Sequence, residues 1–292
     1  MNQSPFTNVR QMLAEYGLAP KKAFGQNFMV DTNFAEAVVR EAAPDERALV
    51  IEIGPGTGCL TRTLLAAHSQ ARVLAMEIDR GLVALLRQTF ADALAQQRLT
   101  LLEGDALAGK HSISPLLIGA ALQISARENR PRCLLCSNLP YNAATPVLAN
   151  FAISQQGLEL ASAIATVQSE VAERMLAKPG AASYGALSIL MALRTKGKIL
   201  RRVGNAVFWP RPAVDSAVIR LDFKPWELAD ATALQREEAS PFQAFLQKLF
   251  SQRRKTLRAV LKTALPTALH LPSDVRAETL PPETILALFR AL

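Results

Sequence analysis

The chain has 292 residues, of which 50% are hydrophobic, and a formal net charge of +8 at pH 7. This length predicts one large domain, or one large and one small domain, with a sizeable buried core. Apolar stretches are interrupted too often for a membrane span, and the N-terminus lacks the basic and apolar segments of a signal peptide. These features predict a soluble cytoplasmic protein that has no membrane partner.

The positive charge is concentrated in the last third of the chain. Residues 191–292 contain 17 Lys and Arg against 9 Asp and Glu, whereas residues 1–190 contain 16 of each kind. A one-sided basic excess suits a partner with a phosphate backbone. A solvated basic surface would give the same composition, so charge alone leaves both interpretations open.

Helical spacing of apolar residues predicts a first helix over residues 6–19. The irregular segment 21–29 follows, and it mixes lysine, aromatic and amide side chains. A loop of this kind beside a folded core can lie over a bound ligand. Asp31 then has the position of a cap for a helix that runs to Arg40.

The apolar run 48–53 ends in glycines at positions 54, 56 and 58, and a helical pattern follows. This order predicts a buried parallel strand, a tight turn and the start of a helix. The spacing G-x-G-x-G, preceded by Glu52, matches neither the dinucleotide fingerprint nor the P-loop. It resembles the first motif of S-adenosylmethionine-dependent methyltransferases.

Two further strands each end beside a carboxylate. Strand 72–78 carries Glu77, and strand 99–103 is followed by Asp105, with helices predicted at 60–68 and 80–95. Strands that alternate with helices predict a parallel, doubly wound sheet whose ligands lie at the carboxyl ends of the strands. There Glu77 can accept hydrogen bonds from both ribose hydroxyls of a cofactor. Asp105 can accept one from the amine of its adenine, or it can simply cap a helix.

The next stretch, 108–131, contains one predicted helix near 115–126 and no recognisable chemistry. Strand 132–136 after it contains Cys133 and Cys136 in C-x-x-C spacing. Residues three apart in a strand face opposite sides, and no second Cys pair or His cluster accompanies them. This pattern favours buried apolar packing, and no metal site is predicted.

That strand runs into Asn138-Leu139-Pro140-Tyr141, the second motif with chemical content. The Asn138 side chain and the Leu139 carbonyl can both accept hydrogen bonds from an aromatic amine, while Pro140 fixes the loop and Tyr141 offers a flat face for stacking. A base amine is a poor nucleophile because its lone pair is delocalised into the ring. Two acceptors on its hydrogens favour sp³ geometry and expose the lone pair to a methyl donor. The cofactor supplies the reactive chemistry and the protein supplies position and electrostatics.

The alternation continues with helix 144–155, strand 160–167 and helix 169–177, a further helix from Tyr184, and a basic strand region near 194–202. An aromatic and proline-rich loop at 208–212 precedes the final strand, 214–221. Phe208 in this loop can clamp a flipped base opposite Tyr141, and local core packing of Phe208 is the alternative.

From Lys224 onward the pattern is helical, and no strand is predicted. Apolar residues over 242–261 recur at the spacing of one helix that Pro266 ends, opposite a basic stripe that suits contacts with an RNA backbone. The predicted RNA-binding residues are Arg253, Arg254, Lys255, Arg258 and Lys262.

Together these motifs resemble the small-subunit (16S-type) ribosomal RNA adenine dimethyltransferase family. The matching stretches occur in family order from residue 21 to about 290, and they are 24–28, 52–56, 77–79, Asp105, 138–141, 184–188, 208–216 and 250–257. The resemblance implies a mostly parallel, seven-stranded Rossmann-like methyltransferase domain over residues 1–224. It also implies a small helical RNA-binding domain over residues 225–292.

The resemblance further implies transfer of methyl groups from S-adenosylmethionine to the 6-amino groups of two adjacent adenosines. These adenosines lie in a hairpin loop near the 3′ end of small-subunit rRNA, and the implied partner is the immature small ribosomal subunit, bound by a monomer. The implied cofactor contacts are Asn27, Met29, Gly54, Glu77, Asp105 and Asn138. The implied catalytic residues are Asn138, Leu139, Pro140, Tyr141 and Phe208. Position 29 is commonly Leu in the family, and segment 108–131 is longer than the family pattern.

Three other functions share parts of this pattern. A large-subunit rRNA adenine methyltransferase of the antibiotic-resistance type is the nearest, and stretches 208–216 and 252–257 favour the small-subunit group over it. A non-catalytic rRNA-binding assembly factor or organellar transcription factor would not need the intact residues Glu77, Asp105 and 138–141. A DNA adenine methyltransferase would need a target-recognition domain large enough to read a duplex, and none is evident.

Overall fold

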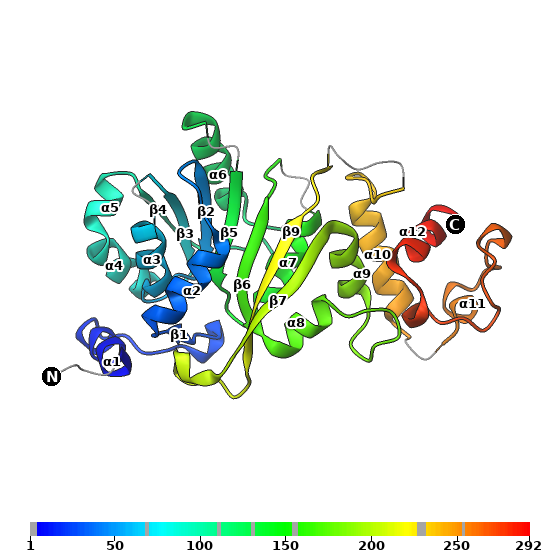
Figure 1. Ribbon diagram of the computed structural model, residues 1–292, viewed down its shortest axis with the longest axis horizontal. Coiled ribbons are helices and arrows are strands. Elements are labelled where there is room, and N and C mark those ends of the chain that lie inside the picture. The colour runs from blue at the N-terminus through cyan, green and yellow to red at the C-terminus, as the bar shows by residue number, and fades with distance from the viewer. Residues whose placement is uncertain are drawn as a thin grey trace.

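The computed structural model describes residues 5–67, 70–109, 112–129, 132–153, 157–226, 232–252 and 255–292, with side chains described from residue 9 onward. Seven strands form its central sheet: β2 Ala48–Ile53, β3 Arg72–Glu77, β4 Leu99–Glu103, β5 Arg132–Asn138, β6 Ser162–Gln168, β7 Thr195–Val203 and β9 Ser216–Phe223. Their order across the sheet is β4-β3-β2-β5-β6-β9-β7, and Figure 1 shows helices on both faces.

Strands β2 to β6 pair in parallel, whereas β9 is antiparallel to both of its neighbours. The chain moves outward from β2 to β4 and then returns to β5 on the other side of β2. The order therefore reverses beside β2, which is the point where doubly wound sheets bind ligands. This sheet confirms the predicted mostly parallel, seven-stranded Rossmann-like fold.

The helices follow the predicted alternation closely, and the Asp31 side chain caps its helix by accepting a hydrogen bond from the backbone N–H of Phe34 over 3.0 Å. The helices are α1 Pro5–Glu15, α2 Thr32–Ala42, α3 Cys59–Ala67, α4 Arg80–Thr89, α5 Ala91–Ala95, α6 Pro115–Arg127, α7 Ala144–Ile153, α8 Ser169–Met175, α9 Ala186–Arg194, α10 Ala239–Phe250, α11 Leu257–Leu261 and α12 Pro282–Arg290. None of these described helices is long and apolar enough to cross a membrane.

Two single helices of the sequence prediction are each divided in the structure. The helix expected over 80–95 breaks at Phe90, whose ring is buried so close to the glycine loop that a Cβ at Gly58 would lie 2.5 Å from it. The helix expected over 242–261 ends at Phe250, and α11 begins only at Leu257. There Thr256 takes an extended conformation and its side chain caps the new helix.

The sheet separates two hydrophobic clusters because successive residues of a strand face opposite sides. Leu49 and Ile51 of β2 pack with α6 and α7, whereas Val50 packs with α2 and α3 on the other face. Cys133 belongs to the first cluster and Cys136 to the second, so both thiols are buried packing groups, as predicted.

A two-stranded sheet joins parts of the chain that lie far apart in sequence. Strand β1, Phe28–Met29, pairs antiparallel with β8, Phe208–Trp209, so that Met29 faces Phe208 in register. The sequence predicts both segments as irregular because two residues carry no periodic signal. The pairing fastens segment 21–29 against the aromatic loop.

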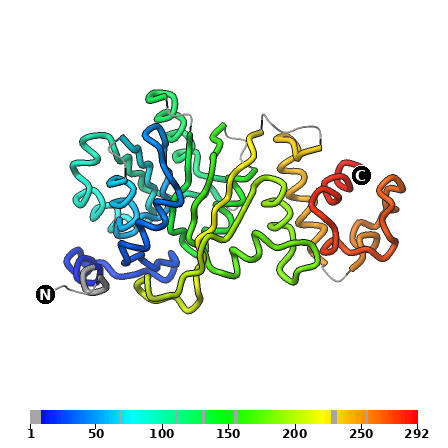
Figure 2. Tube along the Cα trace, viewed as in Figure 1, coloured from blue at the N-terminus to red at the C-terminus, as the bar shows by residue number. Residues whose placement is uncertain are grey.

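The C-terminal helices share a third hydrophobic cluster with α7 and α9. Ile189 and Leu190 of α9 pack there with Phe242 and Leu286. Figure 2 shows these helices at the end of the molecule opposite α1. After Phe223 the described residues form no strand. A domain boundary at residue 224 stays a prediction, because the helices beyond it complete a cluster that α9 begins.

Candidate active site

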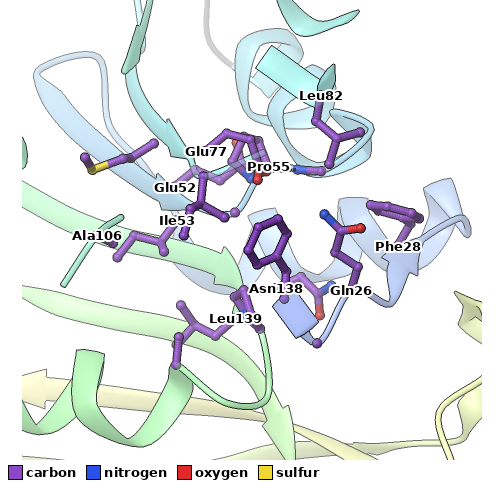
Figure 3. A pocket seen from close by; sticks show the side chains of 18 of the residues that line it. Gln26, Phe28, Glu52, Ile53, Pro55, Glu77, Leu82, Ala106, Asn138 and Leu139 are labelled. Atoms are coloured by element: carbon purple, nitrogen blue, oxygen red, sulfur yellow. Dashed lines mark hydrogen bonds between the residues drawn. The ribbon is translucent and has the colours of Figure 1, made fainter. Parts of the chain in front are cut away.

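A cavity of about 180 Å³ opens at the carboxyl ends of β2, β3 and β5, where the strand order reverses. It is bordered by segment 24–29, glycine loop 53–57, residues 76–78, residues 104–107 and loop 138–143. Figure 3 shows Glu77 and Pro55 on one side of it and Asn138 on the other. The second described cavity encloses only about 10 Å³. The large cavity is therefore the candidate site, and it unites the motifs predicted to bind a cofactor.

The glycine loop depends on glycine for two physical reasons. Gly54 and Gly56 have φ angles of 67° and 60°, in the left-handed region that favours glycine. A Cβ at Gly54 would lie 3.1 Å from the Pro140 ring, and one at Gly56 would lie 2.9 Å from the Phe28 ring. The Phe28 ring therefore packs against the glycine loop at Gly56. Its place in an irregular segment of the sequence did not predict this contact.

Glu77 is held by two backbone donors. Its Oε2 accepts a hydrogen bond from the N–H of Gly56 and its Oε1 accepts one from the N–H of Asp79, each over 3.0 Å. Burial raises the pKa of this carboxyl, and the two backbone hydrogen bonds oppose that shift. Each oxygen keeps lone-pair capacity, so the carboxylate can still accept hydrogen bonds from a ribose.

Glu52, the other acid of the glycine motif, points toward α3. Its Oε2 accepts a hydrogen bond from the Thr61 hydroxyl over 2.6 Å, and the residue is 1% exposed. Burial, reinforced by the nearby charge of Glu77, raises the pKa of Glu52 to about 8. At neutral pH this carboxyl is therefore mostly protonated, and it fastens the end of β2 to the helix that follows the loop.

Asp105 lies at the rim of the cavity and is exposed. Its Oδ1 accepts a hydrogen bond from the N–H of Leu107 over 2.9 Å, which fixes the turn after β4. Ile78, which is 40% exposed, and Ala106 also line the cavity. These two apolar residues, each next to a predicted acid, provide surfaces that could flank a planar adenine. The sequence could have identified Ile78 and Ala106 as site residues only through their positions next to Glu77 and Asp105.

Asn138 at the end of β5 is tied to segment 21–29. Its side-chain nitrogen donates a hydrogen bond to the backbone carbonyl of Asn27 over 3.1 Å. The Asn27 side chain in turn donates to the carbonyl of Gly25 over 3.2 Å. The Asn138 nitrogen is thus engaged, which leaves the oxygen of the same amide as the acceptor that the predicted chemistry requires.

Segment 21–29 is also anchored from its other end, at Asp79. The Lys21 ammonium lies 2.8 Å from Oδ2 of Asp79, and the side-chain nitrogen of Gln26 donates to the same oxygen over 3.2 Å. Burial acts to raise the pKa of Asp79, but the hydrogen bonds from Lys21 and Gln26 outweigh it and hold the pKa below its usual value. No sequence motif predicts this anchor, because Lys21 and Asp79 are 58 residues apart in the chain.

The two predicted stacking aromatics have different surroundings. Tyr141 lines the cavity and its hydroxyl lies 2.8 Å from that of Ser216. Phe208 is 1% exposed, packs edge-on against Phe34 at 6.2 Å between ring centroids, and is not among the residues that line the cavity. In the structure Phe208 is therefore a local core ring, which is the alternative interpretation, and its stacking on a base opposite Tyr141 stays a prediction.

The other predicted cofactor and catalytic residues line the cavity together. They are Asn27, Met29, Gly54, Leu139 and Pro140. Among the predicted RNA-binding residues, Lys255, Arg258 and Lys262 are exposed, and they lie in or beside α11. Figure 1 shows α11 at the end of the molecule opposite α1. Arg253 and Arg254 lie outside the described residues. The single basic helix that the sequence predicts is divided between α10 and α11.

The seven-stranded sheet with β9 inserted antiparallel, the glycine loop at its switch point and the buried Glu77 at the end of β3 define a Rossmann-like methyltransferase. The pattern of the ribosomal RNA adenine dimethylase family matches residues 17–291, and the chain belongs to this family. This match extends over nearly the whole sequence, including the C-terminal helices.

Curated relatives support the same assignment. The ribosomal RNA small subunit methyltransferase A of Moorella thermoacetica is 37% identical over 84% of this chain and 80% of its own length. The protein of the same name from Bifidobacterium longum is 34% identical over 98% of this chain and 92% of its own length. The similarity therefore extends over most of this chain and most of each relative.

Two crystal structures share the fold. A dimethyladenosine transferase from Plasmodium falciparum superposes with a TM-score of 0.63 at 22% identity, over 88% of this chain and 94% of that one. The 23S rRNA methyltransferase ErmE gives the same TM-score at 19% identity, over 91% and 99%. Because the two TM-scores are equal, the fold alone does not distinguish a dimethyladenosine transferase from a 23S rRNA methyltransferase.

Proposed function

We propose that this chain transfers methyl groups from S-adenosylmethionine to the 6-amino groups of adenosines in small-subunit rRNA. Two adjacent adenosines in a hairpin loop near the 3′ end are the proposed targets, and the immature small subunit is the proposed partner. The observation that carries the proposal is the Asn138 amide, held by Asn27 in the wall of the cavity that also contains Glu77. The names of the curated relatives support the choice of small-subunit RNA.

The residues of the cavity fit S-adenosylmethionine, which when bound supplies an electrophilic methyl group. Glu77 offers a fixed carboxylate for the ribose hydroxyls, and Asp105 offers an acceptor for the adenine amine. Gly54 and Gly56 keep the loop free of side chains, so its backbone can approach the ligand closely. Asn27 and Met29 also line the cavity.

The NLPY loop, residues 138–141, would position the target base. The Asn138 oxygen and the Leu139 carbonyl accept hydrogen bonds from the two hydrogens of the amine, which favours sp³ geometry at the nitrogen. The Tyr141 ring supplies a stacking surface, and base stacking on an aromatic ring contributes about 1–3 kcal/mol. The protein acts by holding the amine in line with the methyl donor, since orientation of reactants is a major source of rate.

Basic residues outside the cavity would hold the rest of the RNA. Lys255, Arg258 and Lys262 are exposed, and exposed Lys and Arg contact phosphates without reading sequence. With the undescribed Arg253 and Arg254 they form the proposed RNA-binding part of the C-terminal region. Reversal of Arg258 and Lys262 to Glu should weaken RNA binding and lower its salt dependence.

The test is mass spectrometry of rRNA nucleosides after incubation with S-adenosylmethionine. Undermethylated small subunits are the main substrate, large-subunit rRNA is the parallel substrate, and the Asn138→Ala variant is the inactive control. Two adjacent dimethyladenosines on the small subunit alone are expected. Modification of large-subunit rRNA alone would reassign the substrate, and absence of methylation on both, with cofactor bound, would leave a binding protein.

A further inference from the structure

Strand β7 carries a concentration of exposed positive charge that the proposed site does not use. Four of its nine residues are basic and exposed, namely Lys196, Lys198, Arg201 and Arg202. The strand lies at the edge of the sheet, with β9 on one side only. No described strand pairs with its outer side, and the residues between its buried ends, Thr195 and Val203, are exposed or half-buried.

The charges on β7 are only partly neutralised by nearby acids. Asp222, which pairs in register with Lys196, binds Arg220 over 2.9 Å, and Glu173 binds Arg202 over 2.8 Å. Within the described residues, no ion pair is found for Lys196, Lys198 or Arg201. Glu41 of α2 lines a small groove with Arg201, and its backbone carbonyl accepts a hydrogen bond from Arg220. The surface thus keeps a net positive charge.

The strand leads directly to the part of the site where the target base would bind. Strand β7 runs parallel to β6, because both are antiparallel to β9, so its last residues lie at the same edge of the sheet as the cavity. Val203 pairs with Ser216, whose hydroxyl lies 2.8 Å from that of Tyr141. Figure 1 shows β7 running from α9 toward β1. Arg201, which pairs with Val218, is the basic residue nearest this end of β7 on the face that carries Lys196 and Lys198.

The spacing along β7 suits repeated charges. Lys196 and Lys198 alternate in the strand, so they face the same side and stand about 7 Å apart along it. On that face Arg220 of β9 pairs in register with Lys198, and Asp222 beside it binds Arg220, so the two lysines carry the unpaired positive charge. Several cations along one strand fit a polyphosphate backbone better than they fit a single anion.

We propose that the exposed face of β7 binds the phosphate backbone of the RNA segment next to the target adenosine. The inference rests on the proposed function, since it names a second contact of the same substrate. Charged residues on an edge strand also prevent pairing with other chains. Protection of the edge explains the lysines, but it does not predict that the basic run continues as arginines up to the cavity end.

The test compares the charge-reversed variant K196E/K198E with the matched control R47E/R87E, which reverses two exposed arginines outside β7. Binding of a fluorescently labelled hairpin from the 3′ end of small-subunit rRNA is measured by anisotropy at several KCl concentrations. Each lost phosphate contact lowers the slope of log K against log salt by about 0.7–0.9. For two contacts we expect a slope about 1.5 smaller and roughly 30-fold weaker binding at 0.1 M salt. The control should match the wild type.

A second variant, K196Q/K198Q, separates charge from folding and from edge protection, since it keeps both side chains polar. It should lose affinity and salt slope without aggregating. Equal salt slopes of hairpin binding for the wild type, K196Q/K198Q and K196E/K198E would overturn the proposal. It would also be overturned if K196E/K198E aggregates but its remaining monomer binds the hairpin as tightly as the wild type does. Impaired methylation of whole subunits with unchanged hairpin binding would point to a protein contact and also overturn it.

Failure of the proposed function gives a different result. A wild type that binds the hairpin with a β7-dependent salt slope, yet methylates neither ribosomal subunit, would reject the activity and keep the RNA surface. If the wild type methylates small subunits and K196E/K198E has the same KM for them, the proposed activity is supported and the proposed RNA contact of β7 is rejected. Calorimetry with S-adenosylhomocysteine should give the same affinity for every variant, because β7 does not line the cavity.

Discussion

The hydroxyl oxygen of Tyr141 lies 2.8 Å from the hydroxyl oxygen of Ser216. Tyr141 follows β5, whereas Ser216 begins β9 and is fully buried. The hydrogen bond therefore fixes the outer end of the tyrosine ring to the sheet and leaves the ring itself to form part of the cavity wall. This relationship links the loop that would hold the base to the strand that β7 borders.

The first prediction separates the tyrosine ring from its hydroxyl. Tyr141→Phe removes the hydrogen bond but keeps the stacking surface, so catalytic efficiency should fall only about 2- to 12-fold. Tyr141→Ala also removes the ring, and its loss should reach about 5- to 150-fold. Steady-state methylation of undermethylated subunits is the measurement. Equal rates for the Phe and Ala variants would show that the ring does not contact the base.

The second prediction concerns Asn138. Asn138→Ala removes an acceptor for the target amine, and loss of one such positioned group typically costs about 10²–10³ in rate. Cofactor affinity should fall far less, because the proposed cofactor contacts at Glu77 and the glycine loop stay in place. Single-turnover methylation and calorimetry with S-adenosylhomocysteine measure the two effects. Full activity of this variant would disprove the assigned role.

The sequence predicts most residues of the candidate site because they follow strand ends. Glu77, Asp105 and Asn138 each come after an apolar run, and parallel strands bring their carboxyl ends to one edge of the sheet. The apolar periodicity that identifies the strands is local, so it can be read without knowing any contact. The structure accordingly confirms that these side chains meet around one cavity.

The features that the sequence does not predict depend on contacts between distant segments. Phe208 is a core ring because β1 pairs with β8 across about 180 residues, and a two-residue strand leaves no periodic signal. The break at Phe90 likewise arises from packing against Gly58, and the end of α10 depends on the cap at Thr256. Hydrophobic spacing alone continues through both breaks.

The third prediction addresses the anchor between Lys21 and Asp79. Asp79→Asn removes the charge that holds Lys21, but it keeps a side chain that can cap α4, as Asp79 does through the N–H of Gly81. Segment 21–29 should loosen, and cofactor affinity should fall roughly threefold to tenfold, since half-exposed ion pairs contribute modestly. Lys21→Met should give a similar loss. Calorimetry measures both, and an unchanged affinity in both variants would show that the anchor does not support the site.

The pH dependence of this anchor follows from the lowered pKa of Asp79. A carboxyl whose pKa is depressed by folding contributes stability above its unfolded pKa, near 4, and loses it as the pH falls through the folded value. Cofactor affinity should therefore show no contribution from Asp79 titration between pH 5 and 8. A wild-type loss of affinity in that range that Asp79→Asn abolishes would contradict this.

The last prediction uses the opposite shift at Glu52, whose pKa is raised by burial to about 8. Between about pH 4.5 and pH 8 the folded carboxyl keeps its proton while the unfolded one has lost it, so the free energy of unfolding falls by up to roughly 1.4 kcal/mol per pH unit. Glu52→Gln is neutral in both states and can still accept a hydrogen bond from Thr61. Denaturant unfolding at pH 5 and pH 8 measures the effect. The free energy of unfolding of Glu52→Gln, relative to that of the wild type, should be higher at pH 8 than at pH 5. A constant difference between the two proteins would mean that Glu52 is already ionised in the folded chain.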